Sequence, residues 1–330
     1  LRYRAALLEE EHLDNYDNAI THYFAIVNAD ATEIAASSAL IRLLESAGRY
    51  QELEELLALQ VEITDDIDRA RDLLLRLARI RLTELGDAER AVDALSRLVE
   101  NLYFEDPALE LLDEVVEEAS DAGYRASQLL ETACNETGQY ERLAEVYKTQ
   151  IDRFADEVDR VERFRALATL YETHFHDVDT AFIYISQAFK LEPSSQAIHE
   201  QLISYAKERA GFDELFDIYL DVLVQLEEAD GRNSLRKKMV EIYHDELDDL
   251  DHAEMIYRDM LDDEADNEFA LDRLQKLYHE QEKWEEVIDV LRTRVEVARS
   301  DKARISTLYE IATLYRESTG DLAESLDTYE

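Results

Sequence analysis

The sequence predicts an all-α fold, a right-handed superhelical solenoid of α–α helix pairs. The 330-residue chain contains only two prolines and seven glycines beside 46% apolar residues, a composition typical of an ordered helical core. Apolar residues recur at spacings of three and four in successive stretches, as on one face of an α-helix. The alternation of helix and short polar break also repeats at nearly constant intervals, which indicates a solenoid.

Two kinds of break mark the repeats. In the first, a polar break precedes a helix with a small residue near its start, at Ala19, Ala91, Ala181, Ala253 and Ser325. In the second, an aromatic residue stands three positions before an aliphatic one, at Tyr50, Tyr140, Phe212 and Trp284. Anchor positions 19, 53 and 91 lie 34 and then 38 apart, and this alternation continues. The sequence therefore predicts repeat units whose lengths alternate between 34 and 38.

Each longer unit contains a predicted helix stop and a predicted helix start. Its first helix has an apolar stripe such as Leu167, Leu170 and Tyr171, and a residue that tolerates left-handed backbone follows. These stops are Asp14, Gly86, His176, Asp248 and Gly320. The next residue is always Asn or Asp, which suits the N-cap of the second helix: Asn15, Asp87, Asp177, Asp249 and Asp321.

One interval, from position 91 to 143, exceeds the shorter repeat length of 34 by 18. The added stretch at 106–123 is amphipathic and has the length of a helix, and Pro107 suits its first turn. We expect an extra helix near 107–120 that bends or offsets the stack. We also expect about eighteen or nineteen helices, no strands and a single continuous solenoid over 1–330, as part of a longer chain.

These residues resemble the tetratricopeptide repeat. The copy at about 34–67 has Leu40, Gly48, Tyr50 and Leu57 at the family's positions, and the copy that ends at Pro193 has Ala181 and Ile185 there. The similarity extends over essentially the whole chain and is greatest to long acidic bacterial scaffolds. The resemblance implies a concave groove, lined by the first helix of each pair, that binds a protein or peptide.

The charge limits the partners. There are 78 acidic and 35 basic residues, so the formal net charge is −43, and such a chain repels nucleic acid and anionic membranes. Apolar runs such as 73–80 are too short to span a bilayer, so we expect no membrane insertion. Adaptation to high salt, solubility and a basic partner all remain open as reasons for the charge. The cytoplasm is the default expectation for the compartment.

We expect no catalytic residues, no cofactor and no metal. The sequence contains no phosphate-binding glycine loop and no nucleophile motif. His174 and His176 form the best metal candidate, but they fall at a helix stop, where His176 would serve the turn. The single cysteine, Cys134, falls on the buried side of a repeat helix and is expected to pack in the core.

The family's groove positions, projected onto the first helices, contain one basic residue in each unit. We therefore predict a peptide-binding groove at Arg42, Arg79, Arg165, Lys207, Lys237, Lys276 and Arg316, with Arg125 as the eighth member of the row. Such a row would bind carboxylates of a peptide by charge-assisted hydrogen bonds. The alternative is that these residues pair with acidic neighbours in the same chain.

The predicted function is that of a non-catalytic scaffold that binds a protein or peptide along its concave face. Two alternatives stay open at the level of the sequence. In the first alternative, the segment is a regulatory or substrate-recruiting arm of a larger enzyme whose catalytic domain lies outside it. In the second, it is a structural spacer that self-associates through the ends of the solenoid.

Overall fold

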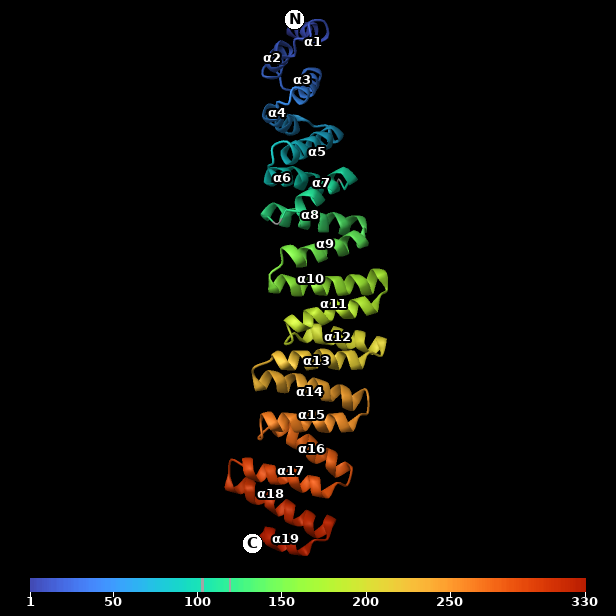
Figure 1. The fold of residues 1–330 in the computed structure, drawn as a ribbon, viewed down its shortest axis with the longest axis vertical. Coiled ribbons are helices and arrows are strands. Elements are labelled where there is room, and N and C mark those ends of the chain that lie inside the picture. The colour runs from blue at the N-terminus through green and yellow to red at the C-terminus, as the bar shows by residue number, and fades with distance from the viewer. Residues whose placement is uncertain (102–103, 119) are drawn as a thin grey trace. The chain divides into compact units, whose positions relative to one another are not determined.

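The computed structural model describes residues 1–101, 104–118 and 120–330, which form 19 α-helices, two π-helical segments and no strand. The helices fall into two compact units, Leu1–Leu191 and Glu192–Glu330, and each is described by itself. Within each unit, helices that follow one another in the chain lie side by side (Figure 1). The all-α helical-repeat prediction is confirmed, whereas the single continuous solenoid, its right-handed twist and its concave face stay predictions.

The first unit contains eleven of the α-helices and one π-helical segment. They are α1 (Arg2–Glu11), α2 (Tyr16–Val27), α3 (Ile34–Ser46), α4 (Tyr50–Ile63), α5 (Ile67–Thr83), α6 (Ala88–Glu100), α7 (Asp106–Val116), α8 (Asp121–Thr137), α9 (Tyr140–Arg153), α10 (Glu157–Leu170), η1 (Tyr171–Phe175) and α11 (Val178–Leu191).

The second unit contains the remaining eight α-helices and the other π-helical segment. They are α12 (Gln196–Arg209), α13 (Phe212–Gln225), α14 (Ala229–Asp245), α15 (Leu250–Asp263), α16 (Glu268–Glu280), α17 (Trp284–Val297), α18 (Asp301–Leu314), η2 (Tyr315–Thr319) and α19 (Leu322–Tyr329).

The predicted repeat lengths match the observed helix starts. The second helices begin at positions 16, 50, 88, 140, 178, 212, 250, 284 and 322, so the step from one start to the next alternates between 34 and 38 except across α7. In two of the longer units the first helix is itself longer: α5 and α14 have 17 residues, against 13 in α3 and α16. In two others the 14-residue helices α10 and α18 continue into the five-residue segments η1 and η2. Because one α-helical turn takes 3.6 residues, the four extra residues add about one turn to the first helix.

The predicted stops and caps of the longer units are also confirmed. All five stops have positive φ, from 47° at Asp14 to 77° at Gly320. The side chain of each following Asn or Asp accepts a hydrogen bond from a backbone N–H two or three residues later; for Asp87 the donor is Arg90, at 3.0 Å. Local chemistry alone therefore sets these helix boundaries.

The predicted extra helix is α7, and it changes which helices are neighbours. Ion pairs join helices two apart in the chain along the whole first unit, in the pairs Arg42–Glu10, Arg76–Glu45, Arg97–Glu62, Arg125–Asp93, Arg142–Asp113 and Arg163–Glu131. Close packing of α5 on α7 and of α6 on α8 continues the same rule across the extra helix. The helices of this unit thus form an odd-numbered row and an even-numbered row.

The single extra helix exchanges the two rows. Before α7 the first helices of the pairs are α1, α3 and α5, in the odd row. After α7 they are α8 and α10, in the even row. The second helices α4 and α6 therefore share a row with the first helices α8 and α10.

Candidate functional site

The eight basic residues predicted to line a groove all lie on first helices or directly after one. Arg42 is on α3, Arg79 on α5, Arg125 on α8, Arg165 on α10, Lys207 on α12, Lys237 on α14 and Lys276 on α16, while Arg316 lies in η2. In the first unit, however, Arg42 and Arg79 belong to the odd row and Arg125 and Arg165 to the even row. The structure therefore does not bring these four into one line.

Five of the eight pair with carboxylates of the same chain. The pairs are Arg42 with Glu10, Arg125 with Glu89 and Asp93, Lys207 with Glu246, Lys276 with Glu280, and Arg316 with Glu317. Lys237 lies over the ring of Phe269, with its Nζ 5.0 Å from the ring centroid. For these five residues the structure shows the intramolecular pairing that was the alternative to a ligand-binding role.

Arg79 and Arg165 have no ion pair among the residues that the structure describes. Arg79 is exposed on α5, whereas Arg165 is half-buried on α10. The Nε atom of Arg165 is buried, and it has no hydrogen-bond acceptor in the described part of the chain. An unsatisfied buried donor costs about 1–3 kcal/mol, so this guanidinium favours an added acceptor.

Arg165 lines a pocket of about 480 Å³ in the first unit. The pocket is bounded by the end of α8 at Asn135, by α9, and by α10 with η1. Its other lining residues are Tyr140, Leu143, Tyr147, Glu162, Ala166, Thr169, Leu170, Thr173 and His174. It combines aromatic walls, an apolar floor and several hydrogen-bonding groups, which is the usual make-up of a site that orients a bound side chain.

Two aromatic groups form its walls. The rings of Tyr140 and His174 stack, with centroids 3.5 Å apart and planes 22° from parallel. Tyr147 is almost fully buried, and burial raises the pKa of its phenol. The phenol therefore keeps its proton at neutral pH.

The two histidines of the metal candidate, His174 and His176, have different structural roles. His174 stacks on Tyr140, and His176 has φ 53° and ends the helix as predicted. In the described ranges, no group of three or more His, Cys, Asp or Glu residues is arranged to hold a metal ion. Cys134 is fully buried and packs with Leu143, Leu167 and Leu170, and burial raises the pKa of its thiol.

A second pocket, of about 360 Å³, opens between α4, α5 and α6. Its lining includes Leu59, Leu74, Leu77 and Ala94 together with the ion pair of Glu62 and Arg97, whose charged atoms are 2.7 Å apart. This pocket was not predicted from the sequence.

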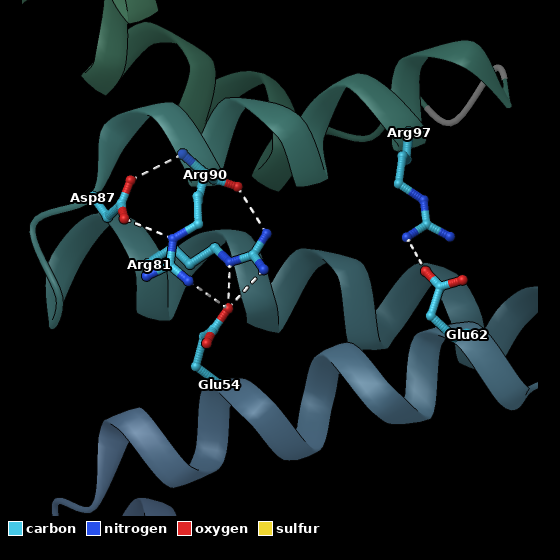
Figure 2. A network of polar contacts seen from close by, with 6 residues as sticks. All are labelled: Glu54, Glu62, Arg81, Asp87, Arg90 and Arg97. Carbon is cyan, nitrogen blue, oxygen red and sulfur yellow. Dashed lines mark hydrogen bonds and ion pairs between the residues drawn. The ribbon is translucent and has the colours of Figure 1, made fainter.

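Beside this pocket a polar network joins the same three helices. Figure 2 shows the Glu54 carboxylate of α4 facing the guanidinium groups of Arg81 and Arg90. Arg81 also donates to the backbone carbonyl oxygen of Arg90, at 2.9 Å, and Arg90 donates to Asp87, at 2.7 Å. The members of this network are paired with one another, so the network has a structural role.

No helix in the described residues has both the length and the apolar character needed to cross a membrane.

Comparison with known proteins places one repeat directly. Residues 64–102, which contain α5 and α6, match the tetratricopeptide repeat family. No curated protein matches the chain. Repeats of this family generally mediate protein–protein interactions, and proteins built from them are typically non-catalytic scaffolds.

Solved structures of low similarity include three repeat proteins. The TPR domain of P58(IPK) is 16% identical, with 96% of this chain and 98% of that chain covered and a TM-score of 0.25. Yeast Tom70 is 13% identical, with coverage of 99% and 98% and a TM-score of 0.26. Human IFIT1 bound to m7Gppp-AAAA is 14% identical, with coverage of 96% and 67% and a TM-score of 0.25. At these values nothing about function follows from the three structures.

The family match agrees with the repeat residues noted in the sequence and with the observed helix pairs. Residues 64–102 therefore contain a repeat of the tetratricopeptide type, within a chain that is all-α and built of repeated helix pairs.

Proposed function

We propose that this chain is a non-catalytic scaffold that binds a protein or peptide partner along its concave face. The observation that carries the proposal is the pocket at Arg165. Its guanidinium has a buried donor without an acceptor in the described residues, while most of the other predicted groove residues are engaged within the chain. A bound partner would supply the acceptor.

Four predicted groove residues of the second unit have a secondary role in the proposal. Lys207, Lys237, Lys276 and Arg316 lie on the first helices of the second unit or just after one. Their present contacts are exposed ion pairs or a cation–π contact, and such exposed contacts exchange readily for a ligand carboxylate.

Partner identification with the intact chain tests the proposal. The chain is used as bait in lysate of its source, bound proteins are identified by mass spectrometry, and the partner is then purified and titrated against wild type and against Arg165→Glu with Lys237→Glu and Lys276→Glu. We expect the triple variant to bind at least tenfold more weakly and to keep its helical circular dichroism. Unchanged affinity would remove these three basic residues from the proposal.

A further inference from the structure

The sequence-based groove runs along the first helices throughout, but the row exchange at α7 leads to a different surface. We propose that a partner segment binds across α4, α6, α8 and α10, with an aliphatic side chain in the pocket at Leu59 and an acidic side chain at Arg165. We refer to this surface as the even-helix face. The inference rests on the proposed function, because the pocket at Arg165 is the same, and it adds the course and chemistry of the partner.

Both pockets have lining residues on two helices of this row. The pocket at Leu59 is lined by α4 and α6 together with α5, and the pocket at Arg165 by α10 with η1, by α9 and by the end of α8 at Asn135. In each case two even-numbered helices flank one odd-numbered helix. The proposed segment follows the even row because each pocket has lining residues on two of its helices and on only one odd-numbered helix.

Ion pairs hold this row together and neutralise most of its basic residues. Arg97 pairs with Glu62 between α6 and α4, Arg125 with Asp93 between α8 and α6, and Arg163 with Glu131 between α10 and α8. The links are 2.7–2.9 Å long.

Of the row's basic side chains, Arg165 is the one that both lines a pocket and lacks an ion pair among the described residues. Its buried Nε–H requires an acceptor, and a carboxylate oxygen makes the strongest hydrogen bond with a guanidinium.

The two pockets select different side chains. The floor of the pocket at Leu59 consists of Leu74, Leu77 and Ala94, all at most 4% exposed, and Leu59 at its rim is 43% exposed. An apolar floor with an exposed leucine beside it gains most from an aliphatic side chain, at about 25 cal/mol for each Å² of apolar surface buried.

The net charge of the chain restricts the partner further. A protein with a formal charge of −43 repels an acidic tract at long range, so the segment carries an isolated acidic residue among neutral ones. The salt dependence of binding therefore distinguishes the proposed segment from a basic partner, whose binding to this acidic chain would weaken as salt is added. Binding of the segment proposed here holds or strengthens with salt, because salt screens the long-range repulsion.

The test uses a phage-displayed library of random linear peptides selected on the intact chain. Enriched peptides are labelled with fluorescein and titrated by anisotropy against wild type, Arg165→Gln, Leu59→Asp and Arg79→Gln. Arg79 is the matched control, since it is an exposed arginine on the other row and has no ion pair with any described residue. We expect enriched peptides to combine an aliphatic and an acidic residue. The first two variants should weaken binding about tenfold or more, whereas Arg79→Gln should leave it unchanged.

Folding is controlled by thermal unfolding of each variant, and Leu59→Ser replaces Leu59→Asp if the charged variant unfolds. Peptides whose binding depends on Arg79 but not on Arg165 or Leu59 would overturn the even-helix face and leave the proposed scaffold function standing. A selection that enriches no peptide would also overturn this inference, while the partner identification above decides the scaffold function independently.

Discussion

The Glu54 carboxylate receives two hydrogen bonds from the Arg81 guanidinium, at 2.9 Å from Nε and 2.6 Å from Nη2. This pair joins α4 to α5, and its side chains are only 10% and 13% exposed. Arg90 on α6 adds a weaker contact with the same carboxylate at 3.4 Å (Figure 2). One carboxylate therefore connects three successive helices of the first unit.

Replacing Arg81 with Leu is expected to destabilise the first unit by about 2–3 kcal/mol, because the variant leaves Glu54 charged, mostly buried and paired only with Arg90. The measurement is the midpoint of urea unfolding followed by circular dichroism. The matched control is Arg97→Leu, since the Arg97–Glu62 pair has nearly the same distance but side chains that are 47% and 66% exposed. Exposed pairs contribute about 0–1 kcal/mol, so a control as damaging as Arg81→Leu would contradict this argument.

The helix stops give a pair of substitutions with opposite expected signs. Gly86 has φ 63° with no heavy atom within 4 Å of an added Cβ, and Ala210 has φ 52° at an exposed position. A side chain in left-handed backbone costs roughly 1 kcal/mol. Gly86→Ala should therefore lower the urea midpoint, and Ala210→Gly should raise it. A destabilising Ala210→Gly would show that backbone entropy outweighs the strain at this turn.

These stops also show which part of the fold local sequence determines. Asp14, Gly86 and His176 were identified from their place before a capping Asn or Asp, and all three have positive φ. Such boundaries depend on a few adjacent residues and on backbone sterics, so they need no knowledge of the packing. For the same reason the register of the repeats could be predicted to the residue.

The row exchange at α7 and the choice of ion-pair partners could not be predicted in this way. The inserted helix was predicted, but its effect depends on α7 packing beside α5 rather than leaving the stack. Arg42 and Arg125 were assigned to a groove, yet each reaches a carboxylate 32 positions earlier in the chain, on Glu10 and Asp93. In a chain with 78 acidic residues the sequence offers many candidate partners, and only the packing selects among them.

The N-cap at Asp177 predicts a pH-dependent difference between two variants. Its side chain accepts from the Thr180 hydroxyl at 2.6 Å and from the Thr180 N–H at 3.0 Å, and these bonds hold the pKa of the carboxyl below its usual value. Asp177→Ala should cost about 1 kcal/mol at neutral pH.

Because the folded pKa is lowered, the cap's contribution is complete above the unfolded value and is lost as the pH falls through the folded value. The wild type should therefore approach Asp177→Ala in strong acid. Asp177→Asn retains an acceptor that does not titrate, so its stability relative to Asp177→Ala should not change with pH. Urea midpoints measured from neutral to strongly acidic pH test both expectations, and a constant gap between wild type and Asp177→Ala would contradict them.

A buried histidine makes the second unit sensitive to mild acid. His199 on α12 is 4% exposed, and its Nε2 lies 2.7 Å from the hydroxyl oxygen of Tyr219 on α13. Burial, aided by the positive charge of Lys238 and opposed by Glu200, lowers the pKa of His199 from 6.5 to about 4. The folded unit therefore keeps this imidazole neutral well below the pH at which an unfolded chain protonates it.

The sign of the effect follows from proton binding. Between about pH 6.5 and pH 4 the unfolded state binds the additional proton, so stability is complete above this window and falls by up to roughly 3 kcal/mol as the pH drops through it. Urea unfolding across this range should show the loss, and the imidazole resonance of His199 should titrate near pH 4. The double variant His199→Leu with Tyr219→Phe lacks both partners and serves as control. Its stability should fall less than that of the wild type over the same window; an equal fall in both proteins would assign the acid sensitivity to other groups.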